Sequence, residues 1–149
     1  MRAVVQRVRS AKVVVADEVV GQIERGLLVY LAAGKADTSE QARWMAGKLA
    51  AMRIFPDEQD KLNRCVAEEG GELLVVSQFT LYGDVRRGRR PGFDGAAPPA
   101  LAEALYDEVC AALREQGLWV QTGRFRTSME VHSCVWGPVT ILVDSERAF

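Results

Sequence analysis

A chain of 149 residues has the length of one domain, and its composition, 48% hydrophobic and 26% charged, is that of an ordinary globular protein, which excludes disordered, collagen-like and coiled-coil chains. A net charge of −1 gives the whole molecule no strong attraction to nucleic acid. No apolar run has the length of a membrane span, and residues 1–10 lack the order of a signal peptide. Three widely spaced cysteines argue against a disulfide framework or a zinc site. We therefore expect one domain over residues 1–149, in the reducing cytoplasm and without a membrane partner.

The first half of the sequence predicts a series of β-strands followed by a helix. Four stretches are rich in apolar and β-branched residues: residues 3–8, 12–15, 19–23 and 27–33. Thr38 followed by Gln41 fits a capping box, and large side chains then recur with helical spacing, which predicts a helix over residues 38–52. Residues 53–72 contain the proline and glycine pairs that are typical of loops.

The strongest strand signal lies at residues 73–82. Its first half is apolar throughout, as in a strand that is buried on both faces. The segment then becomes polar at Ser77, Gln78 and Thr80, which is typical either of the edge of an active site or of a strand that emerges into solvent. Residues 83–97 are rich in glycine and predict an irregular loop.

The last third predicts a helix and three more strands. Pro98 and Pro99 suit the first turn of a helix, leucine and valine then recur every fourth residue, and Gly117 ends the pattern. The strands are expected at residues 118–121, 129–135 and 139–143, with only three residues between the last two. The predicted fold class is α+β, with two main helices packed on a largely antiparallel, barrel-like sheet.

The scarcity of histidine limits the chemistry of any active site. His132 is the single histidine, and it is expected on a sheet face beside Glu130, where a structural role is favoured over a catalytic one. The sequence also lacks G-x-S-x-G and the glycine-rich nucleotide motifs. An enzyme with this sequence is expected to use main-chain groups, hydroxyls, arginines or the substrate itself.

Arginine is unusually abundant, with 15 arginines against 4 lysines. Four arginines lie within five residues of the irregular loop: Arg86, Arg87, Arg89 and Arg90. A guanidinium group binds phosphate through two parallel hydrogen bonds, which an ammonium group cannot do. Charge patterning alone is compatible with a phosphate-binding loop and equally with a solvated one.

Two short motifs resemble the signature of a known family. Ser77-Gln78-Phe79-Thr80 and Gly137-Pro138-Val139-Thr140 are together similar to motifs of the D-aminoacyl-tRNA deacylases, also called D-tyrosyl-tRNA deacylases. Further similar segments extend along the chain: VVQRV from residue 4, GLLVYL from 26, RIFPDEQDKLN from 53, RRPGF from 89, AAPP from 96 and TGRF from 122. The resemblance implies a barrel-like α+β homodimer that hydrolyses the ester between a D-amino acid and the 3′ adenosine of tRNA, without metal or organic cofactor.

The resemblance assigns the catalytic pocket to Ser77, Gln78, Phe79 and Thr80. Their main-chain N–H groups, notably near Ser77 and Phe79, are expected to stabilise the oxyanion of the reacting ester. The Thr80 hydroxyl is a weak nucleophile when no base is adjacent. Catalysis assisted by the 2′-hydroxyl of the substrate ribose therefore makes better physical sense, with the protein supplying positioning.

The resemblance also implies a chiral gate formed by Gly137 and Pro138. These residues are expected to reach from one subunit into the pocket of its partner, where their carbonyl groups exclude an L side chain and allow glycine to pass. Arg7 is expected to steady this element, and Phe93 and Met129 to border the bound substrate. The resemblance to a tRNA enzyme favours phosphate binding by the four arginines of the irregular loop.

The sequence departs from the family pattern around this gate. Val135-Trp136 replaces the usual Asn-Asp, Arg126-Thr127-Ser128 replaces small residues, and His132-Ser133 replaces Ser-Leu. We expect Trp136 and Arg126 to modify which aminoacyl group or tRNA end is accepted. Two alternatives to a D-aminoacyl-tRNA deacylase remain open: a related enzyme for another misacylated tRNA, and a non-hydrolytic module that binds the tRNA end.

Overall fold

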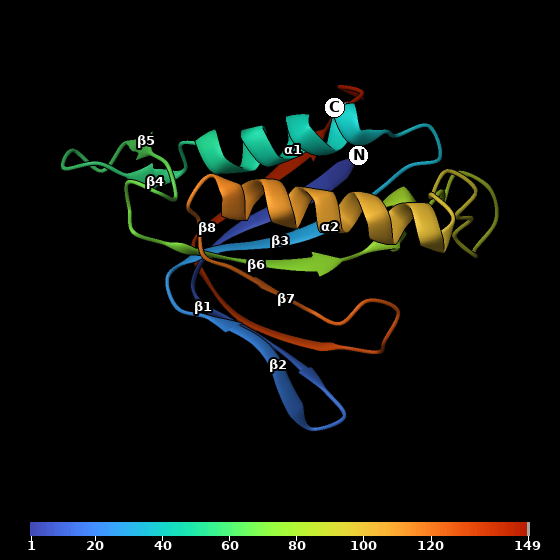
Figure 1. Ribbon diagram of the computed structural model, residues 1–149, viewed down its shortest axis with the longest axis horizontal. Coiled ribbons are helices and arrows are strands. Elements are labelled where there is room, and N and C mark those ends of the chain that lie inside the picture. The colour runs from blue at the N-terminus through green and yellow to red at the C-terminus, as the bar shows by residue number, and fades with distance from the viewer. Residues whose placement is uncertain (149) are drawn as a thin grey trace.

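The computed structural model describes residues 1–148 and shows a strongly curved sheet with two helices on one face (Figure 1). The strands of this sheet are β1 (Arg2–Val15), β2 (Glu18–Ile23), β3 (Gly26–Ala32), β6 (Glu72–Ser77), β7 (Val120–Thr122) and β8 (Glu130–Asp144). The helices are α1 (Ser39–Ala51), α2 (Pro99–Glu115) and the short 3₁₀ helix η1 (Phe79–Tyr82). Strands β4 (Phe55–Pro56) and β5 (Leu62–Arg64) form a separate hairpin. Within residues 1–148, no helix has the length and apolar character needed to cross a membrane.

The long strand β1 organises the sheet. Its first half pairs with β3 and its second half with β2, while β8 runs antiparallel along the other edge. Strand β3 pairs with β6, and β6 with β7, both in parallel. The sheet then curves until β2 approaches β7, so closely that a Cβ atom on Gly21 would lie 2.3 Å from the Thr122 carbonyl oxygen. This approach requires glycine and nearly closes the sheet into a barrel.

The central strands carry a hydrophobic core on each face. Leu73 and Val75 of β6 pack into the core between the sheet and the two helices, whereas Leu74 and Val76 pack into the barrel interior. All four side chains are almost completely buried. The apolar run at residues 73–76 is therefore explained by a strand that is covered on both sides.

Local sequence signals explain both helices. Thr38 caps α1, with its hydroxyl accepting from the Glu40 N–H, and the Gln41 side chain completes the capping box by accepting from the Thr38 N–H. Helix α2 begins at Pro99, where the missing proline N–H costs no helical hydrogen bond. Both helices lie side by side over the sheet, as Figure 1 shows.

The predicted fold class is confirmed, with three corrections to its strands. First, the sheet is mixed, since two of its strand pairs are parallel. Second, the strand expected over residues 73–82 ends at Ser77, because its partner β3 ends at Ala32 and the chain then turns into η1. Third, residues 129–135 and 139–143 belong to one strand, since β1 is long enough to pair with both.

The early strands and the loop at residues 53–72 also differ from expectation. Residues 3–8 and 12–15 form the single strand β1, and the loop contains the short β4–β5 hairpin. The strand expected at residues 118–121 is shifted to β7, Val120–Thr122. Short strands of two or three residues lack the repeated pattern that identifies longer ones.

Candidate functional site

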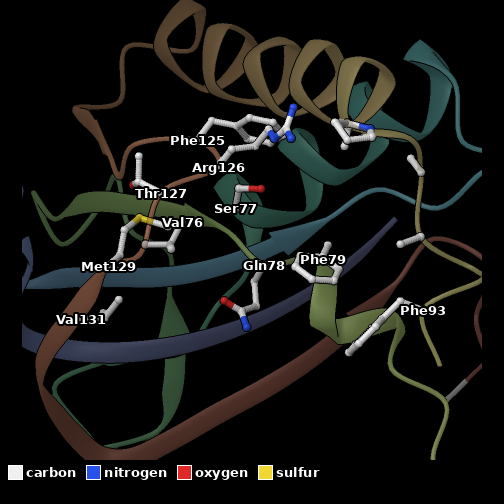
Figure 2. A pocket seen from close by; sticks show the side chains of 14 residues that line it. Val76, Ser77, Gln78, Phe79, Phe93, Phe125, Arg126, Thr127, Met129 and Val131 are labelled. Carbon is white, nitrogen blue, oxygen red and sulfur yellow. The ribbon is translucent and has the colours of Figure 1, made fainter. Parts of the chain in front are cut away.

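A cavity of about 640 Å³ opens at the carboxyl ends of the parallel strands β6 and β7. Parallel strands end at the same edge of a sheet, so the segments that follow β6 and β7 meet there. Figure 2 shows the side chains around the cavity. Its lining residues are Val76, Ser77, Gln78, Phe79, Phe93, Ala96, Ala97, Pro99, Ala102, Phe125, Arg126, Thr127, Met129 and Val131.

The predicted catalytic segment only partly lines this cavity. Ser77, Gln78 and Phe79 are among the lining residues, and Thr80 is not. The Thr80 hydroxyl instead accepts a hydrogen bond from the Gln78 side-chain amide. Thr80 therefore lies outside the cavity wall that the three residues before it help to form. The amide group hydrogen-bonded to its hydroxyl cannot act as a base.

The turn from β6 into η1 exposes main-chain donors at the mouth of the cavity. The Gln78 N–H donates to the Leu31 carbonyl oxygen over 2.8 Å and is thereby occupied. Among residues 1–148, no acceptor is found for the N–H groups of Phe79 and Thr80, as expected for the first residues of a 3₁₀ helix. Of these two donors, only that of Phe79 belongs to a residue that lines the cavity, and a free N–H group there is suited to holding a negatively charged oxygen.

Aromatic and apolar side chains form most of the remaining wall. The rings of Phe79 and Phe93 meet edge to face, with their centroids 5.0 Å apart. The Phe79 ring is 55% exposed, which leaves one face open to a ligand. Met129 lies across the cavity from Phe93 in Figure 2. The site therefore offers flat apolar surfaces of the kind on which a nucleobase stacks.

The arginine-rich loop lies next to this wall. Its ends are joined by two backbone hydrogen bonds between Asp84 and Gly92, and Gly92 directly precedes Phe93 of the cavity. Asp84 accepts hydrogen bonds from the Arg86 side chain at 2.9 and 2.6 Å, and these bonds lower the pKa of Asp84 to about 2. Arg86 is thus neutralised by a carboxylate that stays charged. Arg87, Arg89 and Arg90 are exposed, and no carboxylate within residues 1–148 pairs with them.

The segment around Gly137 and Pro138 bulges out of β8. Gln6 of β1 pairs with Thr140 and Val8 with Val135, so four residues of β8 lie opposite Arg7 alone. Both Gly137 and Pro138 are exposed, their peptide bond is cis, and neither residue lines the cavity of its own chain. Gly137 has a φ of +128°, and a Cβ atom there would lie 2.9 Å from Arg7, so glycine is required at this position.

Arg7 of β1 lies opposite this bulge and hydrogen-bonds to it. Its side chain is 6% exposed, donates from Nε to the Trp136 carbonyl oxygen at 3.1 Å, and donates from Nη1 to the Ile54 carbonyl oxygen at 2.8 Å. Burial lowers the pKa of Arg7, but a guanidinium group keeps its charge at any physiological pH. One of these hydrogen bonds, to Trp136, is made to the bulge itself, and the steadying role of Arg7 stays a prediction.

The Trp136 ring packs against the chain's own arginines. The guanidinium carbons of Arg7, Arg9 and Arg25 lie 4.2, 4.9 and 5.8 Å from the ring centroid. The ring also contacts Phe55 at a centroid distance of 6.3 Å. Trp136 thus joins the bulge of β8 to β1 and to the β4–β5 hairpin by cation–π and aromatic contacts.

His132 lies away from the cavity. It lines a separate hollow together with Lys12 and Cys134, and its Nε2 is 3.4 Å from a carboxylate oxygen of Glu130, as the strand alternation predicts. Within residues 1–148, no cluster of histidine, cysteine and carboxylate side chains is arranged to hold a metal ion.

The sequence alone does not identify several residues as parts of the cavity, chiefly Phe125, Thr127 and Val131. The chain after Thr122 enters the cavity because β7 runs parallel to β6, and parallel pairing of such a short strand leaves no periodic signal. The TGRF segment, which ends at Phe125, was the available signal. Arg126 was identified as a departure from the family pattern, and the structure places it in the cavity wall.

A cavity with free main-chain donors and no histidine among the described residues that line it is suited to holding the oxygen of a polarised carbonyl group. It is not suited to a histidine-activated nucleophile. The fold and the site are therefore those of a small α+β protein whose cavity, among the described residues, offers main-chain donors and no histidine.

Comparison with known proteins identifies the family of this protein. The sequence pattern of the D-Tyr-tRNA(Tyr) deacylase family matches residues 4–144. The chain is 56% identical to the D-aminoacyl-tRNA deacylase of Thermotoga petrophila and 58% identical to that of Anaeromyxobacter dehalogenans, in both cases over the full length of both chains. The chain belongs to the D-Tyr-tRNA(Tyr) deacylase family, a family of hydrolases, and the predicted family resemblance is confirmed.

Solved structures agree with this assignment. The c-Myc DNA Unwinding Element Binding Protein superimposes with a TM-score of 0.91 and 38% identity, covering 97% of this chain and 99% of the other. A probable eukaryotic D-amino acid tRNA deacylase superimposes with a TM-score of 0.85 over 95% of this chain and 97% of its own, at 22% identity. The second likeness supports the fold alone.

Proposed function

We propose that this protein hydrolyses the ester of D-aminoacyl-tRNA to free tRNA and a D-amino acid in the cytoplasm. The observation that carries the proposal is the cavity beyond β6, where Phe79, whose N–H group is free, forms part of an aromatic wall. The wall accommodates the terminal adenine by stacking, and the free N–H group donates a hydrogen bond to the developing oxyanion of the ester carbonyl.

The nucleophile is a water molecule that the substrate helps to activate. The 2′-hydroxyl of the terminal ribose is adjacent to an ester on the 3′-oxygen, so it is positioned without any protein base. The tetrahedral intermediate forms when water adds to the carbonyl carbon, and it collapses by releasing the 3′-oxygen of tRNA, which takes up a proton. Ser77, Gln78 and Phe79 orient the ester, and the free N–H group of Phe79 stabilises the anion between these two steps.

Chirality is controlled by Gly137 and Pro138 of a partner subunit in a homodimer. Both residues project from the edge of β8 and do not reach the cavity of their own chain, which supports a role in a second copy. In a twofold dimer each subunit supplies this element to the other. The element excludes an L side chain by occupying its space, so glycyl-tRNA also passes.

A hydrolysis assay separates the candidate functions. Purified protein is incubated with D-tyrosyl-, L-tyrosyl- and glycyl-tRNA, and the remaining ester is followed over time. We expect rapid loss of the D-tyrosyl and glycyl esters and little loss of the L-tyrosyl ester. Loss of none of the three would favour a module that only binds the tRNA end, and loss of a different misacylated tRNA would indicate an enzyme of altered specificity.

Three arginines of the irregular loop are expected to bind tRNA phosphates. The double variant Arg87→Ala/Arg90→Ala should raise KM severalfold and leave kcat unchanged, because these side chains carry charge that no carboxylate neutralises. Each lost phosphate contact reduces the salt dependence of log KM by about 0.7 to 0.9. The measurement is KM against salt concentration.

The matched control for this prediction changes two exposed cations outside the loop. Lys48→Ala/Lys61→Ala removes the same charge from two exposed lysines that, among residues 1–148, also lack a carboxylate partner, and it is expected to leave the salt slope unchanged. An equal slope for the loop variant and the wild type would show that the loop is merely solvated. Arg86 is omitted from the test because Asp84 already pairs with it.

Trp136 is expected to keep the gate in place through its ring. Trp136→Ala removes the surface on which Arg7 and Arg9 stack, which loosens the bulge that carries Gly137. Cation–π contacts contribute about 0.5 to 2 kcal/mol, so the ratio of D- to L-tyrosyl-tRNA hydrolysis should fall by about twofold to thirtyfold. Trp136→Phe should retain part of the ratio. Trp119→Ala, which removes an exposed tryptophan elsewhere, is the control, and an equal loss there would contradict the assignment.

A further inference from the structure

Arg126 is the single charged side chain among the described residues that line the cavity. The other thirteen are apolar or neutral, and no carboxylate is among them. Figure 2 shows the Arg126 side chain on the side of the cavity that α2 covers, away from Gln78. Arg126 is exposed, so it lies where the cavity meets solvent, and its charge makes the electrostatic potential at that side of the cavity positive.

Arg126 differs from the neighbouring Arg124 in that only Arg124 has an acidic partner among the described residues. Arg124, two residues earlier, points to the carboxylate of Glu18 at 3.6 Å. No carboxylate within residues 1–148 forms an ion pair with Arg126. The same short segment thus directs one arginine to an acidic partner on β2 and the other into the cavity wall without one.

The backbone at Arg126 is in the left-handed region. Its φ is +57°, a conformation that costs free energy for a residue with a Cβ atom. The turn is closed by the Thr127 hydroxyl, which donates to the Arg124 carbonyl oxygen at 2.8 Å. The chain therefore holds an unfavourable conformation at the position that presents this guanidinium group to the cavity.

The first turn of α2 adds to the positive potential. Pro99 and Ala102 line the same cavity, and the amino end of a helix carries a partial positive charge. The first turn of α2 contains no acidic residue that would offset this charge. Arg126 and α2 therefore act in the same direction on any ligand in the cavity.

We infer that Arg126 binds an anionic group of the acylated terminal nucleotide, an inference that rests on the proposed function. Two parts of such a substrate carry an anion: the phosphate on the 5′ side of the terminal adenosine, and the side-chain carboxylate of an acidic D-aminoacyl group. A guanidinium group forms two parallel hydrogen bonds with either of them. Arg126 is thus a residue that determines which substrates bind well.

Non-hydrolysable probes distinguish these two anions. The probes are 3′-amino-3′-deoxyadenosines acylated through an amide with D-asparagine or D-aspartate, each with and without a 5′-phosphate. Binding is measured by calorimetry at low and at high salt. We expect wild-type protein to bind one anionic form about tenfold more tightly than its neutral counterpart, as for a charge-assisted hydrogen bond. A preference for the 5′-phosphate assigns the terminal phosphate, and a preference for aspartate assigns the acyl carboxylate.

Variants of the two arginines test the assignment. Arg126→Ala should abolish the tenfold preference, Arg126→Lys should retain part of it, and Arg124→Ala should leave it intact. Arg126→Gly, which suits a positive φ, serves as a second variant in case the alanine variant is poorly folded. The inference is overturned if wild-type protein binds charged and neutral probes equally, or if Arg126→Ala and Arg126→Gly both keep the preference.

Hydrolysis of D-tyrosyl-tRNA by the same wild-type preparation is measured alongside. Its absence would overturn the proposed function while the probe measurements still decide the role of Arg126. Its presence together with equal binding of all four probes would overturn the inference about Arg126 alone.

Discussion

A mixed dimer is expected to recover discrimination against L substrates when one subunit carries Gly137→Ala and the other carries Ala102→Trp. Gly137→Ala should displace the gate, since a Cβ atom there meets Arg7 at 2.9 Å and the φ of +128° is unfavourable for alanine. The homodimer in which both subunits carry Gly137→Ala should hydrolyse L-tyrosyl-tRNA at least about tenfold faster than wild type. This change corresponds to about 1.4 kcal/mol of lost discrimination. The measurement is the ratio of the initial rates on D- and L-tyrosyl-tRNA.

The second subunit carries an intact gate and a filled cavity. Ala102→Trp places an indole ring where Ala102 lines the cavity, so its homodimer should be inactive on both substrates. In the arrangement that we propose for the mixed dimer, the open cavity of the Gly137→Ala subunit faces the wild-type gate of its partner. If the gate acts between subunits, the wild-type ratio returns.

Two results would contradict this arrangement. One is a mixed dimer that hydrolyses the L ester as fast, per open cavity, as the Gly137→Ala homodimer does, since the gate would then act within its own chain. The other is a monomeric protein with full stereospecificity. Gel filtration of each variant confirms which species is assayed.

The elements that sequence analysis predicted well are those with local signals. The capping box at Thr38 and Gln41 and the prolines at the start of α2 act within one helical turn, so both helices were found within two residues. The doubly buried run at Leu73–Val76 likewise depends on residues that are adjacent in sequence.

The errors concern pairing between distant segments. The end of β6 at Ser77 is determined by where β3 ends, and the continuity of β8 through Gly137 is determined by the length of β1. Neither partner is visible from the strand's own sequence. The same limit explains why Phe125 and Thr127 were missed in the cavity, although the motif at Ser77–Thr80 located its opposite wall.

The charge of the irregular loop shows a further limit. Arg86, Arg87, Arg89 and Arg90 are equivalent in the sequence, but Asp84 neutralises only the first of them among the described residues. Which arginine an acidic residue captures depends on the backbone turn at Arg86, whose N–H also donates to Asp84. The composition of the loop therefore predicts that it is basic, but it does not identify which of its arginines lack a carboxylate partner.

Hydrolysis should depend on the substrate's 2′-hydroxyl far more than on the hydroxyl of Thr80. The Thr80 hydroxyl is bonded to the Gln78 amide and lies outside the cavity lining, and His132 lines a different hollow, so no base activates Thr80. Thr80→Ala should keep kcat within about threefold of wild type, whereas D-tyrosyl-tRNA ending in 2′-deoxyadenosine should react about 10² to 10⁴ times more slowly, the usual range for a lost proton-transfer group. Single-turnover rates on the two tRNAs measure this difference, and binding of the deoxy tRNA by wild-type protein controls for lost affinity. Capture of an aminoacyl ester on Thr80, or equal rates on both tRNAs, would show that the protein supplies the nucleophile or the activating group itself. The main-chain donor of Phe79 would then retain only the role of holding the oxyanion.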